Sequence, residues 1–256
     1  MNIILRFFMI FLLCFGILES HVAIADAGGF AVVELFTSEG CSDCPAADLL
    51  LAKLADEAKK SGQPVYCLSF GVGHWDKQGW KDPFADPAFT RRQMEYSSVL
   101  GLRNYFYTPQ MVVNGTDQFL GSNQAQAEKS IKRFLAIKAP VIVQLKASVT
   151  DGKKEIAVEY HIQNAPAGSL LCVAWVEAET VSTPTAGENK GRTLRHINVV
   201  RNFSSFALRI SPSGRLTLPR QEAKTGTVIA FVQIPGTGRI IGGAAVEIVE
   251  PPAKSH

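Results

Sequence analysis

Two cysteines, Cys41 and Cys44, are separated only by Ser42 and Asp43. Two thiols at this spacing can carry out disulfide exchange, in which one thiolate attacks a disulfide and the second thiol resolves the mixed disulfide. The same pair could instead bind a metal ion or form a structural disulfide. The function of the chain depends on which of these three chemistries applies.

The sequence around the pair predicts a strand before it and a helix after it. Residues 29–37 form a short apolar run rich in β-branched and aromatic residues, which indicates a buried strand. Gly62 is predicted to end the helix. The predicted buried face of the helix has helical spacing and consists of Ala47, Leu50, Leu51, Leu54 and Ala58. Cys41 would then lie at a helix N-terminus, where exposed N–H groups lower the pKa of a thiol. The Asp43 carboxylate would oppose this effect, so a moderately lowered pKa is expected for Cys41.

This setting favours redox chemistry over the other two. A structural disulfide would close so small a loop that it would add little stability. A closed zinc site would need a second ligand pair at similar spacing, which the sequence lacks. Copper(I) needs fewer ligands, so a copper site formed by Cys41, Cys44 and His74 stays open as the alternative. The redox hypothesis requires no organic cofactor, because the cysteines themselves carry the electrons.

Two further residues are candidates for the redox site. Pro109 follows Thr108 just before a strand-like run, where a cis X–Pro bond is most often a built-in feature. Glu34 lies inside the apolar strand and could accept the proton of Cys44 during exchange. The alternative for Glu34 is a carboxylate that reaches solvent at a strand end. His74 could act as a base or a copper ligand, although a histidine beside a tryptophan is more often packed or solvated.

Residues 26–139 predict the order strand, helix, strand, helix, hairpin, helix. The second strand, within residues 63–72, should pair in parallel with the first, because a helix connects them. Asp86 and Pro87 open the second helix. Asn114-Gly115 is a strong hairpin signal, and Ser122 is the expected cap of the third helix.

After Pro140 the sequence changes to short strand-like runs separated by turn signals. We predict an antiparallel, sandwich-like all-β domain over residues 140–250, packed against the first or continuous with it, and a tail at 251–256. Residues 187–200, GENKGRTLRHINVV, are expected to form a solvated loop that leads into a strand, with an anion site as the alternative. Cys67 and Cys172 lie in strand-like runs and are expected to be buried, inert thiols.

Residues 1–25 are predicted to be a cleavable signal peptide. Arg6 precedes an apolar stretch, and small residues at Ala23 and Ala25 precede Asp26. The mature chain is therefore expected in the periplasm or outside the cell, without a stable membrane anchor after cleavage. Its charges are scattered around a net value of +3, which argues against a nucleic-acid partner.

The predicted elements resemble the thioredoxin superfamily. The segment TPQMVVNG, residues 108–115, is similar to the strand that carries the cis-proline of that superfamily. The resemblance implies a nucleophilic role for Cys41, a resolving role for Cys44 and a groove-shaping role for Pro109. Glu34 falls near the buried acid of thioredoxins, one residue further from the motif. The implied fold is an α/β thioredoxin-like domain followed by the all-β domain.

A more specific resemblance is to an exported bacterial family of thioredoxin-like proteins of unknown function. It covers about residues 30 to beyond 200 through the segments VELFTSEGCSDCPAAD, WDKQGWKDPFADPAFTRRQ, YTPQMVVNG and GENKGRTLRHINVV. This chain departs from the pattern at Gly71 and Gly73, where the family has a histidine and an acid.

The expected function is therefore an exported thiol–disulfide oxidoreductase or isomerase-like protein with a protein or small-thiol redox partner. Copper(I) handling is the alternative from another class. A third possibility is an interaction protein whose β domain binds a partner, with the cysteine pair as a structural clip.

Overall fold

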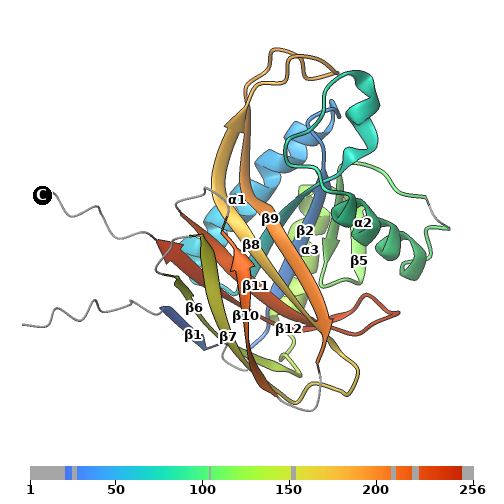
Figure 1. The fold of residues 1–256 in the computed structure, drawn as a ribbon. Coiled ribbons are helices and arrows are strands. Elements are labelled where there is room, and N and C mark those ends of the chain that lie inside the picture. The colour runs from blue at the N-terminus through green and yellow to red at the C-terminus, as the bar shows by residue number, and fades with distance from the viewer. Residues whose placement is uncertain are drawn as a thin grey trace, which may run out of the picture.

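The structure is a computed structural model that describes residues 21–24, 28–103, 105–150, 154–208, 212–220 and 225–249. The described chain has a mixed α/β fold with a large, mostly antiparallel sheet and few helices (Figure 1). The large sheet has eight strands in the order β12-β11-β8-β9-β3-β2-β4-β5, and a smaller sheet has the order β1-β6-β7-β10. Within these ranges, no helix has both the length and the apolar character needed to cross a membrane.

The first half contains the strand and helix predicted on either side of the cysteines. Strand β2 (Ala31–Thr37) leads into α1 (Cys44–Ser61), and β3 (Val65–Gly71) returns in parallel with β2. Gly62 ends α1 in the left-handed conformation with φ 68°, which glycine adopts without a steric penalty. The predicted apolar face of α1 is buried.

Five more elements complete this half. A 3₁₀ helix, η1 (Gly73–Gln78), precedes α2 (Pro87–Val99), and the hairpin of β4 (Gln110–Val113) and β5 (Asp117–Leu120) precedes α3 (Gln124–Leu135).

Local signals at the ends of these elements agree with the structure except at one helix cap. Asp86 caps α2 as expected, since its side chain accepts a hydrogen bond from the Ala88 N–H. The expected cap of α3 was wrong by one residue: Asn123, not Ser122, accepts the N–H of Gln126. Asn114 and Gly115 turn the hairpin with positive φ angles, as predicted.

The helices cover opposite faces of the sheet. Val33 and Leu35 of β2 pack in one core cluster with the buried residues of α1 and α3. Val32 and Phe36 pack in a second cluster that includes Phe89 of α2 and residues of β8 and β11. Since side chains alternate along a strand, each residue of β2 faces either α1 or α2 and never both.

The second half is built from antiparallel strands, as expected. They are β6 (Ile142–Val149), β7 (Glu155–Gln163), β8 (Leu170–Ser182), β9 (Leu194–Ala207), β10 (Ser213–Pro219), β11 (Thr225–Gln233) and β12 (Ile240–Val249). Strand β10 was not predicted. One core cluster joins apolar residues of β6 and β7 to those of β8, β11 and β12, so the two sheets pack face to face.

Pairing of β9 with β3 makes the two halves continuous in the described part of the chain. Strand β9 lies beside β3 in parallel, with Ser69 opposite Val199. This contact inserts the second-half strands into the same sheet as β2 and β3.

The hairpin of β8 and β9 also extends beyond the sheet. We call its outer part, residues 179–197 with the connection 183–193, the β8–β9 arm. The arm reaches η1 and the N-terminal end of α1 at the top of Figure 1.

Strand β1 (His21–Ile24) pairs with β6 at the edge of the small sheet. These residues fall inside the predicted signal peptide. Most of that peptide, residues 1–20 and 25, lies outside the described ranges, as does the predicted tail at 251–256.

Candidate redox site

The cysteine pair lies in the turn between β2 and α1. Cys44 is the first residue of α1, and its backbone N–H donates to the carbonyl oxygen of Cys41 at 3.2 Å. Both side chains are buried, with 2% of Cys41 and none of Cys44 exposed. All four cysteines of the described ranges are free thiols.

The structure brings Pro109 to the cysteines. The Thr108–Pro109 peptide bond is cis, as predicted. The Cys41 Sγ lies 3.7 Å from the carbonyl oxygen of Thr108, the residue before the proline. The Trp75 indole N–H donates to the Thr108 hydroxyl oxygen at 2.7 Å and so ties η1 to this loop. Three of the four predicted site residues, Cys41, Cys44 and Pro109, are therefore close together.

The pKa values of the two thiols are shifted in opposite directions. A hydrogen bond from the Cys44 thiol stabilises the Cys41 thiolate, and the Thr108 hydroxyl and the backbone N–H groups of Asp43 and Cys44 add to it. Together they outweigh burial and lower the pKa of Cys41 from 9.0 to about 7. Burial raises the pKa of Cys44, and the nearby Cys41 sulfur raises it further.

Asp43 affects the pKa of Cys41 in the direction opposite to the expected one. Its side chain is exposed, while its backbone N–H donates toward the Cys41 sulfur and lowers the pKa of that thiol. Water screens the exposed carboxylate, so the backbone contact decides the sign.

The lowered pKa of Cys41 makes a direct prediction for alkylation of the reduced protein. The thiolate is the reactive form, so the rate of alkylation by iodoacetamide should rise with pH and level off above a midpoint near pH 7. Mass spectrometry of the labelled peptides would follow Cys41 and Cys44 separately. A midpoint at pH 8.5 or above, as for an ordinary thiol, would contradict the prediction.

Glu34 does not join this site, which corrects its expected role as a proton relay. It shares the face of β2 with Val32 and Phe36, so it points toward α2 and away from α1. Its carboxylate is fully buried and accepts two hydrogen bonds from Arg92, at 2.6 and 3.0 Å. Glu34 therefore belongs to a buried ion pair on the opposite side of the sheet from the cysteine pair.

His74 also has a different partner from the expected one. Its Nε2 lies 2.8 Å from Gln93 Oε1, and its ring stacks on Phe106. Gln93 in turn donates to the carbonyl oxygen of Tyr107 at 2.7 Å, so His74 supports the loop that carries Pro109. Across the described ranges, no three His, Cys, Asp or Glu side chains are grouped so that they could hold a metal ion.

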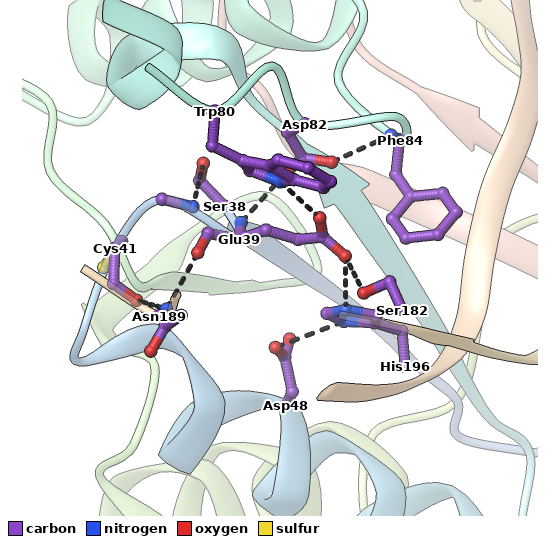
Figure 2. Close-up of polar contacts among 11 residues, drawn as sticks. Ser38, Glu39, Cys41, Asp48, Trp80, Asp82, Phe84, Ser182, Asn189 and His196 are labelled. Atoms are coloured by element: carbon purple, nitrogen blue, oxygen red, sulfur yellow. Dashed lines mark hydrogen bonds and ion pairs between the residues drawn. The ribbon is translucent and has the colours of Figure 1, made fainter. Parts of the chain in front are cut away.

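The β8–β9 arm contacts the cysteine turn directly, whereas the sequence predicted a solvated loop here. The side-chain amide of Asn189 is fully buried and donates to the carbonyl oxygens of Glu39 and Cys41, each at 2.8 Å (Figure 2). The Glu188 carboxylate accepts the backbone N–H of Ser42 at 2.9 Å. The arm therefore holds the turn that carries Cys41 and covers one side of it.

A buried charged cluster lies behind the turn (Figure 2). His196 of β9 lies between two carboxylates, with Nε2 at 3.2 Å from Glu39 and Nδ1 at 3.4 Å from Asp48. Burial opposes protonation of His196, but the hydrogen bonds to Asp48 and Glu39 outweigh it and raise its pKa to about 9. His196 is therefore an imidazolium near neutral pH.

Glu39 connects this cluster to the segment after η1. Burial disfavours its charged form, but hydrogen bonds from His196, Ser182 and Trp80 prevail and lower its pKa. The Glu39 backbone N–H donates to Asp82 at 2.9 Å. Burial raises the pKa of Asp82 to about 6. Several elements thus converge on Glu39, two residues before Cys41.

The sequence contains one signal for this cluster, although Asp48 was not among the predicted site residues. Asp48 follows Cys44 by four residues and interrupts the otherwise apolar face of α1. A carboxylate on a buried helix face requires a partner, such as a histidine elsewhere in the chain. Nothing in the local sequence identifies that partner as His196.

Cys67 and Cys172 are buried away from this site, as expected. Burial raises the pKa of each thiol to about 12. Both are therefore protonated and unreactive near neutral pH.

Comparison with known proteins gives a family and a fold. The model of the family described as "Protein of unknown function (DUF1223)" matches residues 32–233. The X-ray crystal structure of protein AGR_C_4864 from Agrobacterium tumefaciens is similar, with a TM-score of 0.66 and 23% sequence identity. This similarity covers 91% of the present chain and 100% of the other and concerns the fold alone. A search of curated proteins found no match. Since the matched residues span most of the chain, including the cysteine pair and the β8–β9 arm, this protein belongs to the DUF1223 family.

Proposed function

We propose that this protein is a thiol–disulfide oxidoreductase that uses Cys41 as the nucleophile and Cys44 as the resolving thiol. The main support for this proposal is that two thiols with different pKa values lie beside a cis-proline. Cys41 has a pKa near 7 and lies 3.7 Å from the Thr108 carbonyl, while the pKa of Cys44 is raised. An attacking thiol should have a pKa near the ambient pH, and a resolving thiol should stay protonated until it is needed.

The topology of the first half supports a thioredoxin-like domain. Strands β3, β2, β4 and β5 are adjacent, with β2 and β3 parallel and the other pairs antiparallel. Helices α1 and α3 share one face and α2 lies on the other. This arrangement, with the cysteine pair at the start of α1 and cis-Pro109 before β4, agrees with the resemblance to the thioredoxin superfamily.

The proposed order of disulfide exchange follows from the pKa values of the two thiols. The Cys41 thiolate attacks one sulfur of a substrate disulfide, which forms a mixed disulfide and releases the other substrate sulfur as a thiolate. Cys44 then loses its proton and attacks Cys41, and the second substrate sulfur leaves. The substrate gains two electrons, and the protein becomes the Cys41–Cys44 disulfide; the reverse sequence oxidises a dithiol.

Export completes the proposal. Residues 1–25 act as a signal peptide, and the mature protein works in the periplasm or outside the cell on a protein or small-thiol partner. Cleavage before Asp26 would remove β1 and leave β6 at the edge of the small sheet. Disulfides form and persist in such an oxidising compartment.

Equilibration of the protein in buffers of defined glutathione redox state tests the proposal. Alkylation and mass spectrometry should show one reversible two-electron transition, with Cys41–Cys44 as the disulfide formed and Cys67 and Cys172 unchanged. A pair that stays reduced in every buffer, or a disulfide that never reduces, would refute exchange activity. Stoichiometric copper(I) binding without exchange would favour the metal alternative, and His74→Ala would test whether His74 contributes.

A further inference from the structure

Asp48 is the one acidic residue on the buried face of α1. It follows Cys44 by four residues, so the two side chains lie on the same face of the helix, one turn apart. Both are buried, and the charge of Asp48 acts on the Cys44 thiol. A carboxylate here is costly for a helix that otherwise buries alanine and leucine, so its presence calls for a specific role.

His196 approaches Asp48 from the β8–β9 arm, which comes from the other half of the chain. Its Nδ1 lies 3.4 Å from Asp48 Oδ2, and its Nε2 lies 3.2 Å from Glu39 Oε1 (Figure 2). The two nitrogens engage two carboxylates, so the ring orientation is determined at both ends. Asp48 thus pairs with His196 through Oδ2 and acts on the Cys44 thiol one turn before it.

We propose that Asp48 accepts the proton of the Cys44 thiol when the mixed disulfide is resolved, and that His196 is the positioning residue that holds the Asp48 carboxylate. This inference rests on the proposed exchange activity. It assigns the proton-acceptor role to α1 and the arm, in place of Glu34 on the far side of the sheet.

The proton transfer takes place while the mixed disulfide is resolved. In the mixed disulfide, Cys41 Sγ is bonded to a substrate sulfur. The Cys44 thiol transfers its proton to Asp48, and the resulting thiolate attacks Cys41 Sγ. The Cys41–Cys44 bond forms, the Cys41–substrate bond breaks, and the substrate leaves as a thiolate that takes up a proton. Asp48 then returns its proton to solvent, and no further oxidant or reductant is required.

The charges around His196 support this assignment. Glu39 from the turn, Asp48 from α1 and Asp82 from the segment after η1 all face it, and the ring of Phe84 packs against it. The raised pKa of His196, about 9, keeps it cationic below that pH. The imidazolium therefore pairs with Asp48 across the neutral range and loses this function as the pH rises through about 9.

A kinetic experiment separates formation of the mixed disulfide from its resolution. Reduced protein is mixed with glutathione disulfide, quenched with acid, and analysed by mass spectrometry for the Cys41–glutathione adduct and the internal disulfide. In Asp48→Asn, formation of the adduct should change by less than about twofold, whereas its resolution at pH 7 should slow by about 10²-fold, the contribution expected of a positioned base. His196→Gln should slow the same step by less. Asp56→Asn, an exposed acid of α1 paired with Lys60, is the matched control and should resolve normally.

The sign of the Asp48→Asn effect is decisive. As a mere neighbouring charge, Asp48 raises the pKa of Cys44, so its removal would lower that pKa and speed resolution. A proton acceptor gives the opposite result, and unchanged or faster resolution in Asp48→Asn overturns the inference. If the wild type forms neither the adduct nor the internal disulfide, the proposed function itself fails.

The wild-type protein provides a test that needs no folded variant. With Asp48 as the acceptor, the resolution rate should vary by less than about threefold between pH 6 and 8, because hydroxide is not the base. A rise of about tenfold per pH unit would show that Cys44 ionises unaided and would overturn the inference.

Discussion

Cys41→Ser is expected to lose thiol–disulfide exchange, with a rate at pH 7 at least about 50-fold below that of the wild type. The hydroxyl does not attack disulfides, and the remaining thiol cannot replace it. Cys41 has a pKa of about 7, so near pH 7 roughly half of it is thiolate. Cys44 has a pKa raised above 9.0 and is almost entirely protonated at that pH. Reduction of glutathione disulfide, coupled to an excess of dithiothreitol and corrected for the uncatalysed reaction, would measure the loss.

Two other cysteine variants distinguish the role of Cys41 from those of the other thiols. Cys44→Ser retains the attacking thiolate but cannot resolve, so it should accumulate the Cys41–glutathione adduct. Cys67→Ala removes a buried thiol from the sheet and should retain exchange. Exchange by Cys41→Ser at the wild-type rate would be incompatible with the proposed mechanism.

Arg92→Met is expected to destabilise the protein by about 3–5 kcal/mol, because it leaves the Glu34 charge buried without a partner. Glu34 has no exposed surface, and Arg92 is 6% exposed. The guanidinium also contacts the rings of Phe70, Tyr96, Phe203 and Phe231. These residues come from both halves of the chain, so the cost should appear in the unfolding of the whole molecule, as measured by urea denaturation.

A double variant distinguishes loss of the partner from loss of packing. Glu34→Leu combined with Arg92→Met removes both charges, so it should be more stable than Arg92→Met alone. Lys60→Met breaks the exposed pair with Asp56 and should cost at most about 0.5 kcal/mol. If Arg92→Met were as mild as Lys60→Met, the buried pair would not be a major stabilising element.

The protein has two buried groups of charged residues, the Glu34–Arg92 pair and the cluster of Glu39, Asp48 and His196, and they differ in position. Glu34–Arg92 lies where the two halves meet, on the α2 face, and its hydrogen bonds involve Tyr96 and Gln233. The cluster of Glu39, Asp48 and His196 lies behind the cysteine turn on the α1 side. The second lies on the same side of the sheet as Cys44, whereas the sheet separates the first from it.

Elements whose signals are local could be predicted from the amino-acid sequence. The apolar run of β2, the helical spacing of α1, the cis-Pro109 and the Asn114-Gly115 hairpin were predictable because each depends on a few neighbouring residues. Cys41, Cys44 and Pro109 could be assigned to one site because a strand–helix–strand unit and the following hairpin leave few arrangements.

The rest of the site depends on long-range packing and could not be predicted from the sequence. Both faces of β2 are apolar, so alternation could not show whether the face that carries Glu34 meets α1 or α2, and the packing of α2 placed it away from the cysteines. Asn189 and His196 reach the turn from more than 140 residues along the chain. Their approach depends on β9 pairing with β3 and on the length of the β8–β9 arm. Such long-range contacts are stabilised by the packing of the whole sheet, and no short stretch of sequence encodes them.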